Sequence, residues 1–240
     1  MNKILYVVTA RGGSKGVPRK NIRKIAGLPL IAYKIIAAQR TKHKGRIIVS
    51  TDDQEIADVA HRYGGDVPFI RPAELATDTA SSIDVVLHAL EWAEIHDHVN
   101  YDYVCLLEPS SPFATPSDFD MALDMLFKSK SDILLAMKEV GVASCFIWPL
   151  DKQGKLSKFY HAVKSLSGLR RQDQQREYTM NGCMYVAKVE YLKKHKIFHS
   201  ENAIPYIMPE EKSIEIDSMT DYYFAKYCAE NGIIDLSEWK

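Results

Sequence analysis

The residues of this 240-residue chain that could do chemistry concentrate in one loop near its beginning. Residues 11–21 read RGGSKGVPRKN and place four cations, Arg11, Lys15, Arg19 and Lys20, within ten positions. Glycines allow a backbone to approach a ligand closely and to direct N–H groups toward it. The segment matches neither GxxxxGK[ST] nor GxGxxG. Its charge and flexibility predict a site that can neutralise a triphosphate.

The distribution of charge indicates the same region. Lys and Arg balance Asp and Glu at 31 each, yet residues 1–51 contain twelve basic residues and no acidic one. A basic block in an otherwise acidic chain indicates an anionic ligand, either a small phosphate or a nucleic-acid backbone. Nucleic-acid binding favours basic residues spread over a face with interleaved aromatics. Concentration in one glycine loop favours the small phosphate, and we expect no nucleic-acid partner.

The elements that must position this loop alternate between short apolar runs and amphipathic segments. Strands are predicted at 4–8, 46–50, 67–71, 104–107, 133–137, 182–186 and 213–217. Helices are predicted to begin at Pro29, at a capping box formed by Thr51 and Gln54, at Ser81 or Ser82, and at Pro116, with a further helix over the last 20 residues. Such alternation predicts an α/β fold with a mostly parallel sheet.

Polar motifs follow three of these strands directly. RGGSKG comes after the first strand, STDD after the second, and EPSSP after the strand at 104–107. Ligands of open α/β sheets bind at the carboxyl ends of the strands. We therefore expect the three motifs to surround one site.

The regular pattern weakens over residues 141–178, which contain scattered aromatics and the charged run LRRQDQQRE. We interpret residues 1–240 as a single domain in which 141–178 is an insertion that leaves the sheet. An apolar excursion of this kind can pack against a partner chain. The insertion is therefore predicted to be a dimerisation arm.

Membrane and secreted classes are disfavoured. The longest stretch without a charged residue is 140–150, whereas a membrane-spanning helix needs about 20 apolar residues. The start, MNKILYVVTAR, lacks the features of a signal peptide and is interpreted as a first strand. Four cysteines without a CxxC pair suggest reduced thiols, so we expect a cytoplasmic protein without a membrane partner.

Six segments in register resemble the acylneuraminate cytidylyltransferases, which make CMP-activated sialic acids. They are residues 11–21, IVSTD at 48–52, RPAELATDTASS at 71–82, LLEPSSP at 106–112, Asn181-Gly182, and IEIDS at 214–218. The resemblance extends through nearly the whole chain with similar spacing. It implies a Rossmann-like nucleotide-diphospho-sugar transferase fold with a small dimerisation element, and a homodimer.

The resemblance also implies a reaction and its residues. The anomeric hydroxyl of a nonulosonic (sialic-type) acid attacks the α-phosphorus of CTP and expels pyrophosphate, with catalytic charge from Arg11, Lys15 and Lys20. Contacts to CTP are implied for Arg11, Gly12, Gly13, Ser14, Lys15, Lys20, Asn21, Arg71, Ala80 and Ser82. Contacts to the sugar acid are implied for Glu108, Ser110, Arg171 and Asn181.

Mg²⁺ is the implied cofactor, held by Glu215 and Asp217. Residues two apart on a strand point to the same face, and Mg²⁺ usually binds one or two carboxylates together with substrate phosphates. The alternative without the resemblance is a solvated face of an edge strand.

Departures from the family pattern concern the sugar pocket. Glu108 replaces the usual Gln, while Ala114 and Thr179 stand where Arg is common. A carboxylate repels the carboxylate of a substrate, so these changes favour a modified acid of the legionaminic, pseudaminic or deaminated type over N-acetylneuraminate. An octulosonic acid is a further alternative, although the loop PARYGSTRLPGKP of that family is missing. A CTP-binding homologue without turnover is disfavoured by intact Arg11, Lys20 and Asp217.

Overall fold

A six-stranded sheet forms the centre of the computed structural model, which describes residues 2–156 and 175–240. Its strands, in spatial order, are β4 (Arg46–Ser50), β1 (Ile4–Thr9), β5 (Tyr103–Leu107), β7 (Tyr178–Lys188), β6 (Ile133–Glu139) and β8 (Ile204–Ile207). β1 pairs in parallel with β4 and β5, β6 pairs in parallel with β8, and β7 runs antiparallel to β5 and β6. The mostly parallel sheet predicted from the sequence is confirmed.

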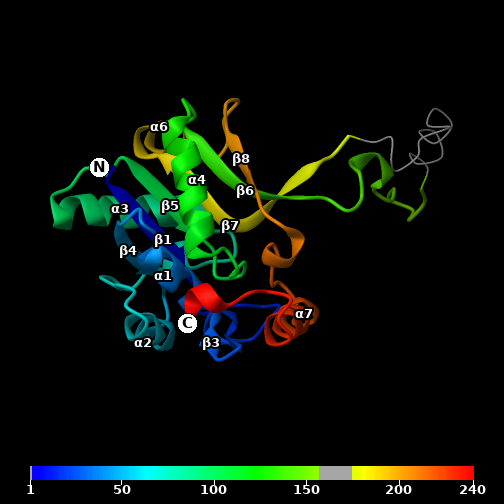
Figure 1. Ribbon diagram of the computed structural model, residues 1–240, viewed down its shortest axis with the longest axis horizontal. Helices are drawn as coiled ribbons and strands as arrows, with labels where there is room; N and C mark the ends of the chain where they lie inside the picture. The colour runs from blue at the N-terminus through cyan, green and yellow to red at the C-terminus, as the bar shows by residue number, and fades with distance from the viewer. Residues whose placement is uncertain (1, 157–174) are drawn as a thin grey trace.

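Helices cover both faces of this sheet (Figure 1). The α-helices of the described residues are α1 (Leu30–Arg40), α2 (Gln54–Arg62), α3 (Ser82–Asp97), α4 (Pro116–Lys128), α6 (Val189–His195) and α7 (Met219–Glu230). Tyr6 and Val8 of β1 belong to the core shared with α1, α2 and α4, whereas Leu5 and Val7 belong to the core shared with α3 and α6. Burial on both faces explains the continuous apolar run of β1.

A third apolar cluster joins the glycine loop to the C-terminal part of the chain. It contains Val17 of the loop, Ile216, and Tyr222 of α7. The hairpin of β2 (Lys24–Ile25) and β3 (Leu28–Pro29), which the sequence analysis did not predict, contributes to the same cluster. This packing holds segments that are about 200 residues apart in the sequence at one edge of the sheet.

Two helix starts agree with the sequence, a third is displaced by one residue because Pro29 is the N-cap of α1, and a fourth does not agree. Ser81 caps α3 by accepting a hydrogen bond from the N–H of Ile83, and α4 begins at Pro116. The capping box of Thr51 and Gln54 is wrong, because Asp53 is the N-cap of α2 and accepts from the N–H of Ile56 at 3.0 Å. Asp is as good an N-cap as Thr, and Thr51 is buried before the helix begins.

Two of the predicted strands are wrong. Residues 67–71 make only an isolated bridge between Thr51 and Ile70, and 213–217 form no strand. The apolar alternation at 213–217 has a different cause: Ile214 and Ile216 are buried in the third cluster, while Glu215 and Asp217 are exposed. An extended segment can alternate in this way without a strand beside it.

The chain leaves the sheet between β6 and β7. Residues 141–156 extend away from the body and residues from 175 return toward β7 (Figure 1). The described part of this excursion exposes apolar side chains, including Ile147 and Leu150, which are 66% and 63% exposed. Its assignment as a dimerisation arm stays a prediction, and Arg171 lies outside the described residues. Across 2–156 and 175–240, none of the helices has the length and apolar character needed to cross a bilayer.

Candidate active site

A cavity of about 370 Å³ lies at the carboxyl ends of β1 and β5. The motifs that follow these two strands meet there, whereas STDD, which follows β4 and was expected at the same site, contributes no residue to the cavity wall. Segment 71–82 and the residue Asp217 complete its wall. Eleven residues implicated by the sequence line this cavity: Arg11, Ser14, Lys15, Lys20, Asn21, Arg71, Ala80, Ser82, Glu108, Ser110 and Asp217.

Four described residues implicated by the sequence are not part of this cavity wall. The N–H of Gly12 donates to the Asp52 carboxylate at 2.9 Å, and Gly13 faces open space. Asn181 is fully buried, and its amide binds Ser213 and the backbone of Cys183, whereas its assignment to the sugar stays a prediction. Glu215 lines a different cavity, together with Lys138 and Ser213.

The glycine loop is held in shape by its own side chains. The amide of Asn21 donates to the backbone oxygen of Arg11 at 2.8 Å and thereby closes the loop. Gly16 packs against the backbone of Asp217 so closely that a Cβ at this position would lie 1.9 Å from the Asp217 oxygen. Only glycine can occupy a contact of this kind. The loop and Asp217 are therefore fixed side by side.

Lys20 connects these two segments through its side chain. Its Nζ donates to the backbone oxygen of Ile216 at 2.9 Å and to the Asp217 carboxylate at 3.1 Å. The ammonium group is mostly shielded from solvent and lines the cavity. Lys20 therefore presents a fixed positive charge to a ligand and also orients Asp217.

Arg71 supplies a second, more deeply buried cation. Its guanidinium donates to the hydroxyl and the backbone oxygen of Ser50, at the end of β4. Burial lowers the pKa of Arg71 to about 10, so the group remains charged at neutral pH. No carboxylate lies within ion-pair distance of it among the described residues. A buried cation without a paired carboxylate can stabilise the negative charge of a bound ligand.

The other cations of the loop are already paired with acids. Arg11 Nη1 lies 2.7 Å from Asp78 Oδ1, and Lys15 contacts the second oxygen of the same carboxylate. Arg19 pairs instead with Asp53 and Glu55 and does not line the cavity. The expectation that Arg19 helps to neutralise a triphosphate is therefore wrong, and three of the loop's four cations face the site.

The N-terminus of α3 also faces the cavity through Ser82. The first N–H groups of a helix carry partial positive charge and favour anions nearby. Arg11, Lys15, Lys20 and Arg71 line the same cavity as this helix end. The arrangement suits a chain of phosphates.

Three carboxylates, those of Glu108, Glu215 and Asp217, lie near one another at or beside this cavity. A Cβ built on Gly182 would lie 3.3 Å from Glu108 Oε2 and 3.3 Å from Glu215 Oε1, which places these two oxygens near one another. Gly182 adopts a φ of +69°, a conformation that glycine accepts readily. Burial first, and then the charge of Glu215, raise the pKa of Glu108 to about 7. Partial burial of the carboxylate, and then the charge of Asp217, likewise raise the pKa of Glu215, although the residue as a whole is exposed.

We expect Glu108→Gln to stabilise the metal-free protein at pH 8, with a much smaller effect at pH 5. The pKa of Glu108 is about 7 in the folded protein and 4.5 for an ordinary Glu. Folding therefore disfavours its ionised form, and the resulting stability is lost as the pH rises from 4.5 to 7. Gln cannot ionise, so the variant does not lose this stability as the pH rises. Allowing for partial solvent exposure, we expect a gain of about 1–2 kcal/mol at pH 8.

The measurement is the free energy of unfolding in urea, with EDTA present, at both pH values. Glu91→Gln provides the control, because Glu91 is exposed on α3 and does not line the cavity. Equal effects of Glu108→Gln at pH 5 and pH 8 would contradict the assignment of a raised pKa to Glu108.

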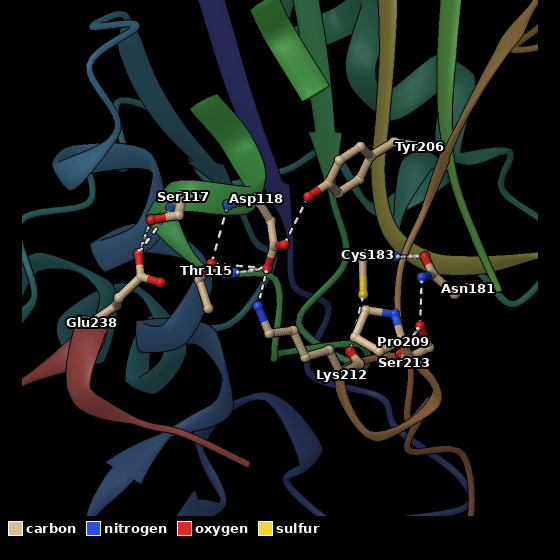
Figure 2. A network of polar contacts seen from close by, with 10 residues as sticks. All are labelled: Thr115, Ser117, Asp118, Asn181, Cys183, Tyr206, Pro209, Lys212, Ser213 and Glu238. Atoms are coloured by element: carbon tan, nitrogen blue, oxygen red, sulfur yellow. Dashed lines mark hydrogen bonds and ion pairs between the residues drawn. The ribbon is translucent and has the colours of Figure 1, made fainter. Parts of the chain in front are cut away.

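A buried polar network anchors the segment that carries Glu215 and Asp217 (Figure 2). Asp118, at the start of α4, accepts hydrogen bonds from the Tyr206 hydroxyl at 2.9 Å and from Lys212 Nζ at 3.0 Å. Further along, Ser213 binds Asn181 and the backbone of Pro209. The network therefore fixes residues 206–213 against the sheet and α4, immediately before the acidic pair.

Sequence reasoning missed three residues that shape this site. Gly16 and Gly182 stand where a Cβ would collide with the opposite segment. Asp78 occupies the centre of the cation cluster, although it belongs to a motif that the sequence analysis quoted. Each of these three residues stands in a motif that the sequence analysis quoted. Their partners come from distant parts of the chain, and only the fold brings them together.

The chain is similar to known proteins over most of its length. The cytidylyltransferase family model matches residues 5–230. The chain is 34% identical over 223 residues to the CMP-N,N'-diacetyllegionaminic acid synthase of Legionella pneumophila, covering 92% of this chain and 93% of that protein. It is 32% identical over 228 residues to the pseudaminic acid cytidylyltransferase of Campylobacter jejuni, with 93% and 95% covered.

A solved structure shares the fold. CMP:2-keto-3-deoxy-manno-octonic acid synthetase complexed with CTP superimposes with a TM-score of 0.66 at 15% identity, covering 96% of this chain and 100% of that one. The likeness shows that the two chains share the mixed sheet with flanking helices.

Proposed function

This chain belongs to the cytidylyltransferase family, and we propose that it transfers CMP from CTP to the anomeric hydroxyl of a nonulosonic acid and releases pyrophosphate. The observation that carries the proposal is the cavity itself, which three loop cations, Arg71 and a helix N-terminus line together with the carboxylates of Glu108 and Asp217. The cations suit a triphosphate, and the carboxylates suit a divalent cation and a polar sugar acid.

The reaction forms a bond between the anomeric oxygen of the acid and the α-phosphorus of CTP, and breaks the bond between that phosphorus and the bridging oxygen of pyrophosphate. The hydroxyl loses its proton to water or to a carboxylate, and pyrophosphate leaves as an anion. Phosphoryl-type transfer is accelerated mainly by positioning and charge neutralisation. Arg11, Lys15 and Lys20 provide fixed positive charge where negative charge accumulates on the leaving group.

We propose that Glu215 and Asp217 hold Mg²⁺ when CTP is bound. Asp217 lines the cavity and its side chain is 68% exposed, so its oxygens are accessible to a cation and to water. The described residues contain no group of three acidic, His or Cys side chains close enough to cage a metal. Two carboxylates fit Mg²⁺, which usually completes its coordination with phosphate oxygens and water. The ion would neutralise phosphate charge.

The sugar acid is proposed to be a legionaminic or pseudaminic type of nonulosonic acid. Glu108 lines the cavity and lies near Glu215, so negative charge at this position disfavours the carboxylate of the substrate there. A hydroxyl or acylated amine of the sugar can instead donate to Glu108. The relatives named for legionaminic and pseudaminic acids support this class.

The test is pyrophosphate release from CTP and Mg²⁺ with a panel of nonulosonic acids offered singly, together with an octulosonic acid. We expect turnover with a legionaminic or pseudaminic type of acid to exceed turnover with N-acetylneuraminate. A clear preference for N-acetylneuraminate would refute the proposed substrate, and a clear preference for the octulosonic acid would assign the chain to the other activity of the fold.

We further propose that the chain acts as a homodimer in the cytoplasm. The exposed apolar side chains of residues 142–156 support an interface with a second copy, and four free cysteines are consistent with a reducing compartment. Light scattering is expected to give twice the chain mass of 27.2 kDa. Ile147→Asp is expected to shift this value toward the monomer, whereas Lys152→Ser, at an exposed polar position of the same segment, is not. A monomeric wild-type protein would contradict the proposed arm.

A further inference from the structure

The Asp78 carboxylate occupies the place where the loop cations should meet phosphate. One of its oxygens lies 2.7 Å from Arg11 Nη1, and the other contacts Lys15 Nζ. All three residues line the cavity. Hydrogen bonds from Lys15 and Arg11 hold the pKa of Asp78 below its usual range, so the group is ionised at neutral pH. A bridging carboxylate between two cations has the charge and the geometry of a phosphate oxygen pair.

A triphosphate and Asp78 cannot make the same contacts at once. Arg11 and Lys15 are two of the cations that the proposed reaction uses to bind the β- and γ-phosphates and then pyrophosphate. When Arg11 or Lys15 binds a phosphate, the cation either gives up its contact with Asp78 or divides its charge between Asp78 and the phosphate. Asp78 therefore lowers the net affinity of this end of the cavity for any anion.

The chain that carries Asp78 is suited to such an exchange. Residues 76–81 form a short exposed turn between the 3₁₀ helix Ala73–Leu75 and α3, closed by hydrogen bonds from Ala80 N to Thr77 O and between the hydroxyls of Thr77 and Thr79. Displacement of the carboxylate into solvent requires no break in the apolar core. The same turn contains Ala80, which lines the cavity.

We propose that Asp78 is an internal competitor for the pyrophosphate part of the site, which makes binding depend on a full triphosphate and promotes release of pyrophosphate. This inference rests on the proposed function. A nucleotide must bring enough phosphate charge to displace Asp78, which CTP does and CMP does not. After transfer, the return of Asp78 to Arg11 and Lys15 opposes retention of the product.

The variant Asp78→Asn tests this directly, because it preserves side-chain size and removes the charge. Isothermal titration of the full chain with inorganic pyrophosphate and Mg²⁺ is expected to show about three- to tenfold tighter binding than wild type, the range that loss of two exposed ion pairs permits. CMP is expected to bind with less change, because its single phosphate does not reach both cations. Thermal melting confirms that the variant folds.

The matched control is Asp84→Asn, which removes an exposed acid from the first turn of α3 without touching the cavity wall. It should leave pyrophosphate affinity within about twofold of wild type. Unchanged or weaker pyrophosphate binding by Asp78→Asn would overturn the proposal and assign Asp78 to orienting the two cations. Tighter binding without CMP-ester formation by the wild-type protein would instead refute the proposed function alone.

Discussion

Asp217→Ala is expected to lower kcat/KM for pyrophosphate release by about a thousandfold while the protein remains folded. The Asp217 carboxylate lines the cavity beside Lys20 and is one of two groups proposed to hold Mg²⁺. Loss of a metal-anchoring group removes several kcal/mol of charge stabilisation, and each factor of ten corresponds to about 1.4 kcal/mol. The backbone of this segment is fixed independently by the hydrogen bond from Ile216 N to Ser110 O at 2.8 Å.

Metal binding provides a second measurement for the same variant. Mn²⁺ titrated in the presence of CTP, followed by its electron paramagnetic resonance signal, should bind the wild type and bind Asp217→Ala much more weakly. Asp58→Ala, an exposed position on α2, serves as the control for loss of one acid. Near-normal turnover and Mn²⁺ binding by Asp217→Ala would remove Asp217 from the metal site.

Lys20→Ala is expected to lower kcat/KM by about a hundred- to a thousandfold. The ammonium group both faces the ligand cavity and holds Ile216 O and Asp217 in place, so its removal deletes a fixed charge and loosens the acidic pair. Lys20→Arg keeps the charge, but its planar guanidinium cannot reproduce the compact geometry of the ammonium group. We expect it to recover only part of the activity.

Steady-state kinetics with varied CTP checks the Lys20 prediction. Lys24→Ala is the matched control, because Lys24 is an exposed lysine four residues further on that does not line the cavity. Its kcat/KM should remain near the wild-type value. Activity of Lys20→Ala within about threefold of wild type would show that the remaining cations suffice and that Lys20 is not a catalytic residue.

Local patterns in the sequence predicted the parts of the fold that depend on burial period and on helix starts. The apolar run of β1 and the proline at the first position of α4 behave as the same patterns do in other α/β proteins. The prediction of a strand at 213–217 was wrong because the alternation of apolar and acidic residues there has another cause. Ile214 and Ile216 pack into the third cluster, and no strand of the described residues pairs with the segment. A two-residue period of apolar side chains does not by itself distinguish a strand from an extended segment that packs on a core.

In the candidate site as well, the sequence predicted some features and could not predict others. The cations of the glycine loop and segment 71–82 converge because both lie at one edge of the sheet, which topology predicts. The separation of Arg19 from the other cations could not be predicted, since its acidic partners Asp53 and Glu55 come from α2. The role of Asn181 in binding Ser213 likewise depends on a segment 32 residues away.

The central claim is that this cavity joins CMP from CTP to a nonulosonic acid. The most direct test quantifies pyrophosphate and the CMP ester in the same samples, with the preferred acid and with CTP, UTP, ATP or GTP as nucleotide. We expect equal molar amounts of the two products with CTP and no ester with the other three nucleotides. Pyrophosphate formed without a CMP ester, or no product from CTP with any acid of the panel, would contradict the account.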